Sequence, residues 1–219
     1  MSRLAQIQPT TDHATTDEGM SSPSEHWYVN LSYPDTAIPL PVDETEDISA
    51  WAESTAWSRL PPEATAETIS EFAEALIGAT LDSRTRSPLY AYFLSVYPEH
   101  GELARIEVQS ISPESADEEL TVEQMAGFFS APEPTSLNPA QVTPRTLPAG
   151  PAARIAHQYV GEPDEAGDST VTQTLAYAVR PPDIRQGIVL FLTWSALYFS
   201  DELFELGDIM AESIQVERK

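Results

Sequence analysis

Histidines are the side chains best suited to acid–base chemistry near neutral pH, and the chain has no cysteine to add thiolate chemistry. There are four of them: His13, His26, His100 and His157. None pairs with a second histidine or a carboxylate at i+3 or i+4 within a convincing helix, as a helical metal site requires. His157 alone falls in an expected strand, on the same face as Ile155 and Tyr159. We interpret it as a half-buried sheet histidine, with a proton shuttle or a binding contact as the functional alternative.

Nucleophile and nucleotide motifs are missing from the chain. Ser195 lies in the stretch TWSAL, without the two flanking glycines of a nucleophile elbow. Neither G-x-G-x-x-G nor G-x-x-x-x-G-K-[ST] occurs, and the only lysine is Lys219. The acidic run at 117–119 is typical of a solvated loop, with a cation or basic-peptide site as the alternative. The sequence therefore predicts no catalytic residue, no metal site and no bound cofactor, and we expect that the protein is not an enzyme.

Tryptophans offer the clearest candidates for a contact surface. Trp51 and Trp57 lie six residues apart in an expected helix, which places them about 120° apart around its axis. Both cannot point at one sheet, so we expect one of them to be exposed and to mark a partner contact. Trp27, at the start of the folded part, and His157 complete the set of candidate contacts.

Net charge narrows the classes of partner. The chain carries a formal charge of −24, and binding to nucleic acid or to an anionic membrane requires a basic footprint. Its longest apolar run, 188–192, is too short to cross a bilayer. The absence of cysteine is compatible with a reducing compartment, so we expect a cytoplasmic protein. The acidity itself is explained either by solubility or by an acidic face for a basic partner.

Hydrophobic periodicity predicts the elements that hold these residues. Residues 1–24 are polar and are expected to be disordered, whereas 25–219 are expected to form one domain. Apolar residues recur every three or four positions in 47–60 and 63–82, as in amphipathic helices. Strands are expected at 26–34, 89–97 and 104–112, then on either side of 148–151, at 171–179 and at 187–197, the last at the sheet centre. Ser200 is expected to cap a final helix.

This order of elements predicts an α+β fold with an antiparallel sheet and helices packed on it, the C-terminal helix included. Alternation in 104–112 places Ile106 and Val108 on one face, and Arg105, Glu107 and Gln109 on the other.

The C-terminal third carries a family resemblance. An apolar strand that runs into DELFELGDIMAESIQVE resembles the end of Mog1/PsbP-like proteins, including the LpqN-type members of actinobacteria. The resemblance covers about residues 140–217, and 26–130 only in the order of elements. It implies the fold and a non-enzymatic role as an adaptor, assembly factor or chaperone for a protein partner. The chain lacks the lipobox cysteine of the lipoprotein members, so membrane anchoring is not implied.

Three hypotheses follow for function. The first is a cytoplasmic adaptor or chaperone-like protein that presents a sheet face or groove, framed by the 47–60 helix, to a protein partner. The second is an acidic inhibitor or nucleic-acid mimic that occupies a basic site on another protein. The third is an enzyme that uses His157 with a carboxylate. The sequence gives neither the partner nor the oligomeric state.

Removal of the polar N-terminal segment tests the expected domain boundary. A protein that starts at Ser24 loses no apolar periodicity, so its thermal unfolding midpoint should match that of the full chain within about two degrees. Differential scanning calorimetry of both proteins makes the comparison. A much lower midpoint for the shortened protein would mean that the segment packs on the domain.

Overall fold

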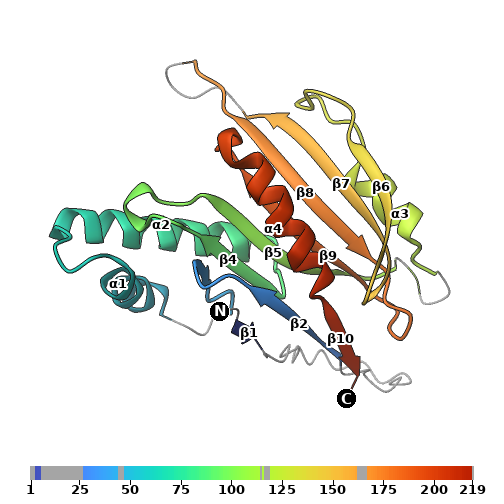
Figure 1. Ribbon diagram of the computed structural model, residues 1–219, viewed down its shortest axis with the longest axis horizontal. Helices are drawn as coiled ribbons and strands as arrows, with labels where there is room; N and C mark the ends of the chain where they lie inside the picture. The colour runs from blue at the N-terminus through green and yellow to red at the C-terminus, as the bar shows by residue number, and fades with distance from the viewer. Residues whose placement is uncertain are drawn as a thin grey trace.

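A seven-stranded antiparallel sheet forms the frame of the molecule (Figure 1). The structure is a computed structural model that describes residues 3–5, 27–43, 47–113, 115, 119–161 and 167–218. The strand order is β3-β4-β5-β9-β8-β7-β6. The strands are β3 (Ala37–Pro39), β4 (Tyr90–Leu94), β5 (Ala104–Ile111), β6 (Gln141–Leu147), β7 (Gly150–Val160), β8 (Val171–Val179) and β9 (Gly187–Trp194). The predicted α+β class, with helices on an antiparallel sheet, is confirmed.

β9 is the central strand, as its apolar sequence predicts. It pairs with β5 on one side and β8 on the other, so all of its neighbours are strands. Ile188, Leu190 and Leu192 have no accessible surface. These three side chains lie on the α4 side, and Val189 is buried in the cluster around α3 on the other face, which explains the apolar run.

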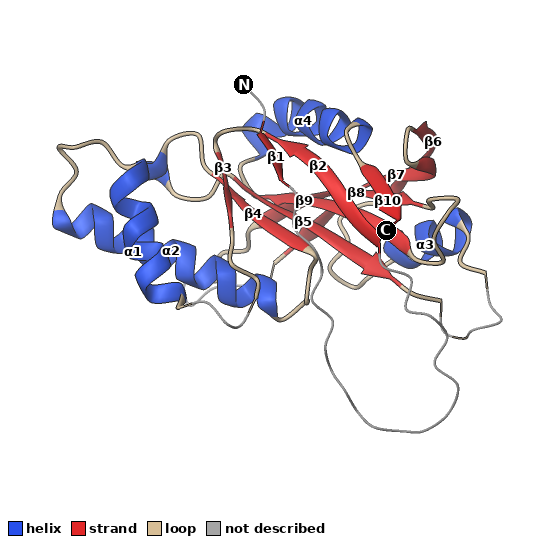
Figure 2. Cartoon of the chain, turned by 90° about the horizontal axis from the view of Figure 1, so that it is seen from below, coloured by secondary structure: helices blue, strands red, loops and turns tan. Residues whose placement is uncertain are grey.

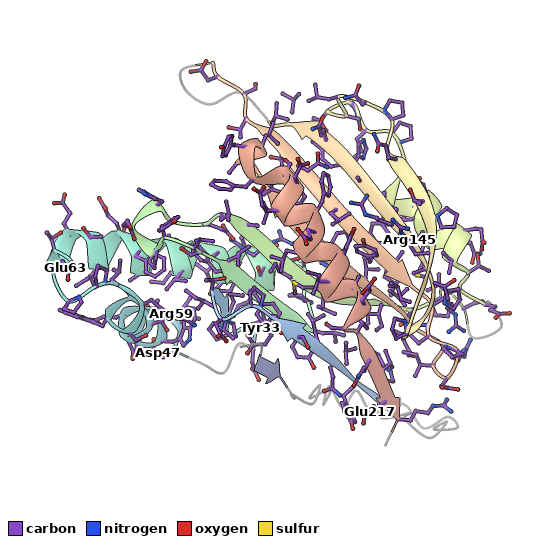
Figure 3. All side chains as sticks on the ribbon, in the orientation of Figure 1. Tyr33, Asp47, Arg59, Glu63, Arg145 and Glu217 are labelled. Atoms are coloured by element: carbon purple, nitrogen blue, oxygen red, sulfur yellow. The ribbon has the colours of Figure 1, made fainter. Side chains whose placement is uncertain are left out.

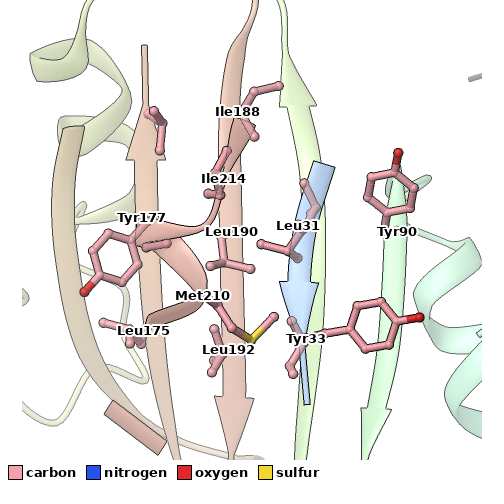
Figure 4. Packing of buried hydrophobic residues seen from close by; sticks show 14 of the residues in the cluster. Leu31, Tyr33, Tyr90, Leu175, Tyr177, Ile188, Leu190, Leu192, Met210 and Ile214 are labelled. Carbon is pink, nitrogen blue, oxygen red and sulfur yellow. The ribbon is translucent and has the colours of Figure 1, made fainter. Parts of the chain in front are cut away.

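One face of the sheet is covered by α4 (Ser200–Glu212) and by a small sheet of order β1-β2-β10. The small sheet contains β1 (Arg3–Ala5), β2 (Trp27–Tyr33) and β10 (Gln215–Arg218). Leu31 from β2, Met210 from α4 and Leu190 from β9 belong to the same buried cluster (Figure 4). Gly207 brings α4 close to β8, because a Cβ at that position would overlap the Leu175 side chain.

The opposite face is covered at its two ends (Figure 2). At the β3–β4 end, α2 (Ala66–Arg84) packs Phe72 against Phe93, and α1 (Ile48–Arg59) lies against α2. At the β7–β8 end, α3 (Val122–Phe129) buries Met125 in a separate cluster with Ile155. Within the described residues no helix lies over the middle of this face, between α2 and α3.

Three of the four described α-helices begin after a residue whose side chain caps the helix. Asp47 caps α1 through its side chain, Thr65 caps α2, and Thr121 forms a capping box with Gln124 at α3. The prediction that Ser200 caps α4 is wrong, because Ser200 is already the first helical residue. Its hydroxyl instead accepts a hydrogen bond of 3.0 Å from the Trp194 indole.

Several strand assignments also differ from expectation. The 26–34 strand is β2, which pairs with β1 and β10 and not with the main sheet. β3 and β10 were not predicted, because the first has three residues that end at a proline and the second is mostly exposed. The 187–197 strand ends at Trp194, where a 3₁₀ turn (Leu197–Phe199) begins shortly afterwards. Apart from β1, the N-terminal segment 1–24 lies outside the described residues.

Large-to-small changes in the two core layers test this packing. Leu190→Ala and Phe72→Ala should each lower the free energy of unfolding by about 2–5 kcal/mol, because each leaves a cavity in a buried cluster. Urea denaturation measures the loss, with Val142→Ala on the exposed part of β6 as the control. A wild-type denaturation midpoint for either core variant would contradict the packing described here.

Candidate functional site

The two tryptophans of α1 differ in exposure, as their spacing predicts. Trp57 is 63% exposed. Trp51 is half-buried and packs on the cluster formed by α1, α2 and the sheet. Trp57 is therefore the one of the pair that can contact a partner, and that role stays a prediction.

Trp27 and His157 lie far from α1. Trp27 opens β2 and is partly buried against the core on the α4 side. His157 in β7 is only 4% exposed and its ring lies 4.3 Å from that of Tyr159. Among the described residues neither of its ring nitrogens has a hydrogen-bond partner. It is buried instead of half-buried, and the four predicted contacts do not form one site.

A cleft of about 620 Å³ occupies the uncovered middle of the sheet. Its floor consists of side chains from β5, β9 and β8 that point to the α2–α3 side. Thr174 of β8, Thr193 of β9 and Arg105 of β5 stand in one row across the sheet. The C-terminal turns of α2 form one wall, so the cleft is framed by α2 and not by α1 as expected.

An ion-pair network holds this wall to the floor. The Arg86 guanidinium donates to the Glu107 carboxylate at 2.9 and 2.6 Å, and to the Asp82 carboxylate at 3.0 and 2.7 Å. The Glu107 side chain is only 5% exposed, and Gln109 also donates to it at 3.1 Å. Glu107 therefore accepts hydrogen bonds from two side chains on its cleft side, those of Arg86 and Gln109.

Arg105 makes the second part of the network. It pairs with Glu102 and donates to the Ala79 carbonyl at 2.8 Å and to the Ser83 hydroxyl at 2.9 Å. It also lies 3.2 Å from the Asp82 carboxylate. Two guanidinium groups therefore fasten the last turns of α2 to β5.

These contacts shift the ionisation of the cleft residues. The hydrogen bond from Arg86 holds the pKa of Asp82 below its usual value. The pKa of Arg86 is raised, first by its hydrogen bonds to Glu107 and then by those to Asp82. The charged groups of the wall and floor are thus paired with one another. These pairs hold the charges at fixed positions in the cleft. The described residues contain no group of three or more histidines or carboxylates that could hold a metal ion.

Hydroxyl groups cover the other side of the floor. Thr172, Thr174 and Thr193 line the cleft together with Ser195, and the Thr172 and Ser195 hydroxyl oxygens are 3.4 Å apart. Each hydroxyl can both donate and accept a hydrogen bond. This half of the floor can therefore bind amide groups of either polarity.

Exposed apolar side chains follow the last cleft-lining residues in the chain. Leu197, Tyr198 and Phe199 follow Ser195 and Ala196 in the chain and are 39%, 90% and 40% exposed. We call these three residues the apolar lip. Consecutive exposed apolar side chains are unusual on a soluble surface and often mark a contact.

Sequence reasoning placed Arg105, Glu107 and Gln109 on one strand face but did not make them a site. The alternation of charged and apolar residues was the available signal. Their partners, Asp82 in α2 and Arg86 just beyond its end, precede them by more than twenty residues, and no local pattern connects them. Of the acidic run at 117–119, only Glu119 lies within the described residues, and it is exposed.

Comparisons with known proteins concern the arrangement of the elements. No protein-family profile matches the sequence, and no curated protein is similar to it. The structure is similar to LpqN of Mycobacterium tuberculosis, a protein involved in cell envelope biogenesis, with a TM-score of 0.47 and 11% identity over 88% of this chain and 85% of that one. It is also similar to PsbP (CyanoP) of Synechocystis sp. PCC 6803, with a TM-score of 0.45 and 12% identity over 93% of this chain and 98% of that one.

LpqN and PsbP are the kinds of protein that the C-terminal sequence resembles. Their similarity to this chain lies in the fold, and the residues of the cleft are described from this chain alone.

The network makes stability depend on pH. Because the pKa of Asp82 is lower in the folded than in the unfolded state, its ionised form stabilises the fold at neutral pH. That contribution disappears as the pH falls through the acid range below about 3.9, the usual aspartate pKa. The gap in unfolding free energy between wild type and Asp82→Asn should therefore be largest near neutral pH and shrink in acid. Urea titrations across this range measure it, with exposed Glu71→Gln on the same helix as the control. A gap that does not change with pH would contradict the role given to Asp82.

Proposed function

We propose that this protein is a non-enzymatic adaptor that binds a protein partner at the cleft and the apolar lip. One observation carries the proposal: the middle strands of one sheet face form an open cleft beside the end of α2, and exposed apolar residues follow its floor residues Ser195 and Ala196 in the chain. Interfaces concentrate binding energy in a few aromatic anchors surrounded by polar groups. Tyr198 in the lip and Trp57 on α1 are the exposed aromatic anchors of this proposal.

Pairing of the charged groups favours binding over catalysis. A general acid or base must be within reach of a substrate and free to exchange a proton. Glu107 is buried under Arg86, while Arg105 is held by Glu102 and by groups on α2. The hypothesis of an enzyme based on His157 finds no support here, because this buried ring does not line the cleft.

The acidic-mimic hypothesis stays open as the second candidate. It predicts carboxylates in rows at phosphate-like spacing, whereas an adaptor is compatible with charge spread over the surface. Charged side chains lie at both ends of the molecule, with Asp47, Arg59 and Glu63 at the α1–α2 end and Arg145 and Glu217 at the other (Figure 3). The cytoplasm is the location that we propose. The described helices include none that is long and apolar enough to span a bilayer.

Capture experiments on native lysate separate the adaptor from the mimic. Immobilised wild type should retain a partner, and Tyr198→Ala or Trp57→Ala should each lower its capture by about tenfold or more, because an aromatic anchor contributes about 2 kcal/mol or more. Neutralisation of Asp117, Glu118 and Glu119 together should weaken capture only slightly. Mass spectrometry quantifies the retained partner at low and high salt, and thermal unfolding confirms that each variant is folded.

The opposite pattern would favour the mimic. If the acidic triple variant fails to capture, capture falls steeply with salt, and both aromatic variants bind normally, the adaptor proposal is wrong. Loss of capture in Tyr198→Ala alone would support the cleft and lip as the site and remove Trp57 from it.

A further inference from the structure

We propose that the cleft takes an extended peptide segment that presents a lysine or arginine and an aromatic or aliphatic residue on the same side, two positions apart. This inference rests on the proposed function and names the chemistry of the partner. It depends on three features of the described residues: the sign of the accessible charge, the hydrogen-bonding groups of the floor, and the position of the apolar lip.

The network in the cleft carries an excess of negative charge. Three carboxylates (Asp82, Glu102 and Glu107) meet two guanidinium groups (Arg86 and Arg105), which leaves one negative charge unbalanced. The Asp82 side chain is the most exposed of the five, at 58%, while that of Arg105 is only 13% exposed. A ligand that enters the cleft therefore meets a carboxylate at the rim, and a cationic side chain is the complementary group.

The chain as a whole reinforces this preference. Its formal charge of −24 produces a negative potential that attracts cationic segments and repels anionic ones before contact. The local and the global charge therefore select the same sign of ligand.

The hydroxyl groups of the cleft floor are better suited to bind a peptide than a compact cation. The strands of the floor already pair with one another, so the floor offers side chains and not backbone edges to a ligand. Thr172, Thr174, Thr193 and Ser195 present a row of groups that donate and accept. An extended segment, which exposes an amide hydrogen and a carbonyl at each residue, can use them along its length.

The apolar lip offers a binding position for the aromatic or aliphatic residue of the peptide. Asp82 and Glu102 belong to the α2 side of the cleft, and the lip continues from Ser195 and Ala196 at the end of β9. A basic side chain on the carboxylates and an apolar one on Tyr198 thus bind to different parts of one surface. A purely basic segment would leave the lip exposed to water.

Fluorescence anisotropy with defined peptides tests the inference. One probe is a fluorescein-labelled nonapeptide mixture with lysine or arginine fixed two positions from phenylalanine or leucine, and the matched probe has glutamate in place of each basic residue. We expect saturable binding of the basic probe and at least about tenfold weaker binding of the acidic one.

Charge-reversal of the network is the decisive variant. Asp82→Asn with Glu102→Gln converts the cleft from one excess negative to one excess positive charge. It should lower affinity for the basic probe by about threefold to tenfold. The matched control, Glu71→Gln with Glu74→Gln, makes the same change in total charge on the outer face of α2. Equal losses in both variants would show general electrostatic attraction and overturn the inference.

A second measurement does not depend on the stability of the charge variant. Because the chain has no cysteine, Thr172→Cys introduces a single thiol at the floor, and Glu74→Cys introduces one outside the cleft. A benzophenone attached to Thr172→Cys should cross-link the basic probe, and the label at Glu74→Cys should not. Cross-linking at Glu74→Cys alone, or equal labelling of the acidic probe, would overturn the inference.

The two proposals can fail separately. If Tyr198→Ala abolishes capture of the lysate partner but the basic and acidic probes bind alike, the cleft is an adaptor surface with a different ligand chemistry. If no variant affects capture, and the probes do not bind, both proposals are wrong.

Discussion

A buried carboxylate constrains the architecture of this molecule. Glu107 lies in the second strand of a hairpin at 5% side-chain exposure, and an ionised group in that position requires a partner. Arg86, just beyond the end of α2, supplies two hydrogen bonds to it. The requirement holds the end of the helix over β5, and Arg105 reaches back from the same strand to the Ala79 carbonyl and the Ser83 hydroxyl. Removal of either arginine would leave charge or backbone groups of this layer without their partners.

The position of α2 determines where the sheet stays open. Helix α2 extends the apolar cluster of the β3–β4 end, and α3 builds an independent one around Met125 at the β7–β8 end. The opposite face has one continuous cluster from β2 to α4. One face is thus complete and the other is interrupted, and the interruption contains both the paired charges and the hydroxyl groups of the floor. The asymmetry explains why the apolar run of β9 is followed on the cleft side by Thr193 and, just after the strand, by Ser195.

Much of the fold could be predicted because its signals are local. The helix 66–84 shows its apolar stripe in sequence, and β9 shows its central position through an unbroken apolar run. β10 escaped prediction because four mostly exposed residues gain their strand conformation only from pairing with β2. The cleft could not be predicted, because the sequence does not show that Arg86 and Glu107 form an ion pair. That pairing becomes visible only when α2 and β5 are placed in space. Helical geometry alone predicted that one of Trp51 and Trp57 is exposed, and the structure identifies it as Trp57.

The row of side chains across the cleft floor also has a fixed spacing. Arg105, Thr193 and Thr174 are register partners on β5, β9 and β8. Adjacent strands are held about 4.8 Å apart by backbone hydrogen bonds, so the two outer residues of the row are separated by about 10 Å. Side-chain substitutions can change what the floor attracts, but they cannot change this spacing. The repeat of the floor groups is therefore a property of the backbone, and a ligand can bind all three only if its own polar groups match that repeat.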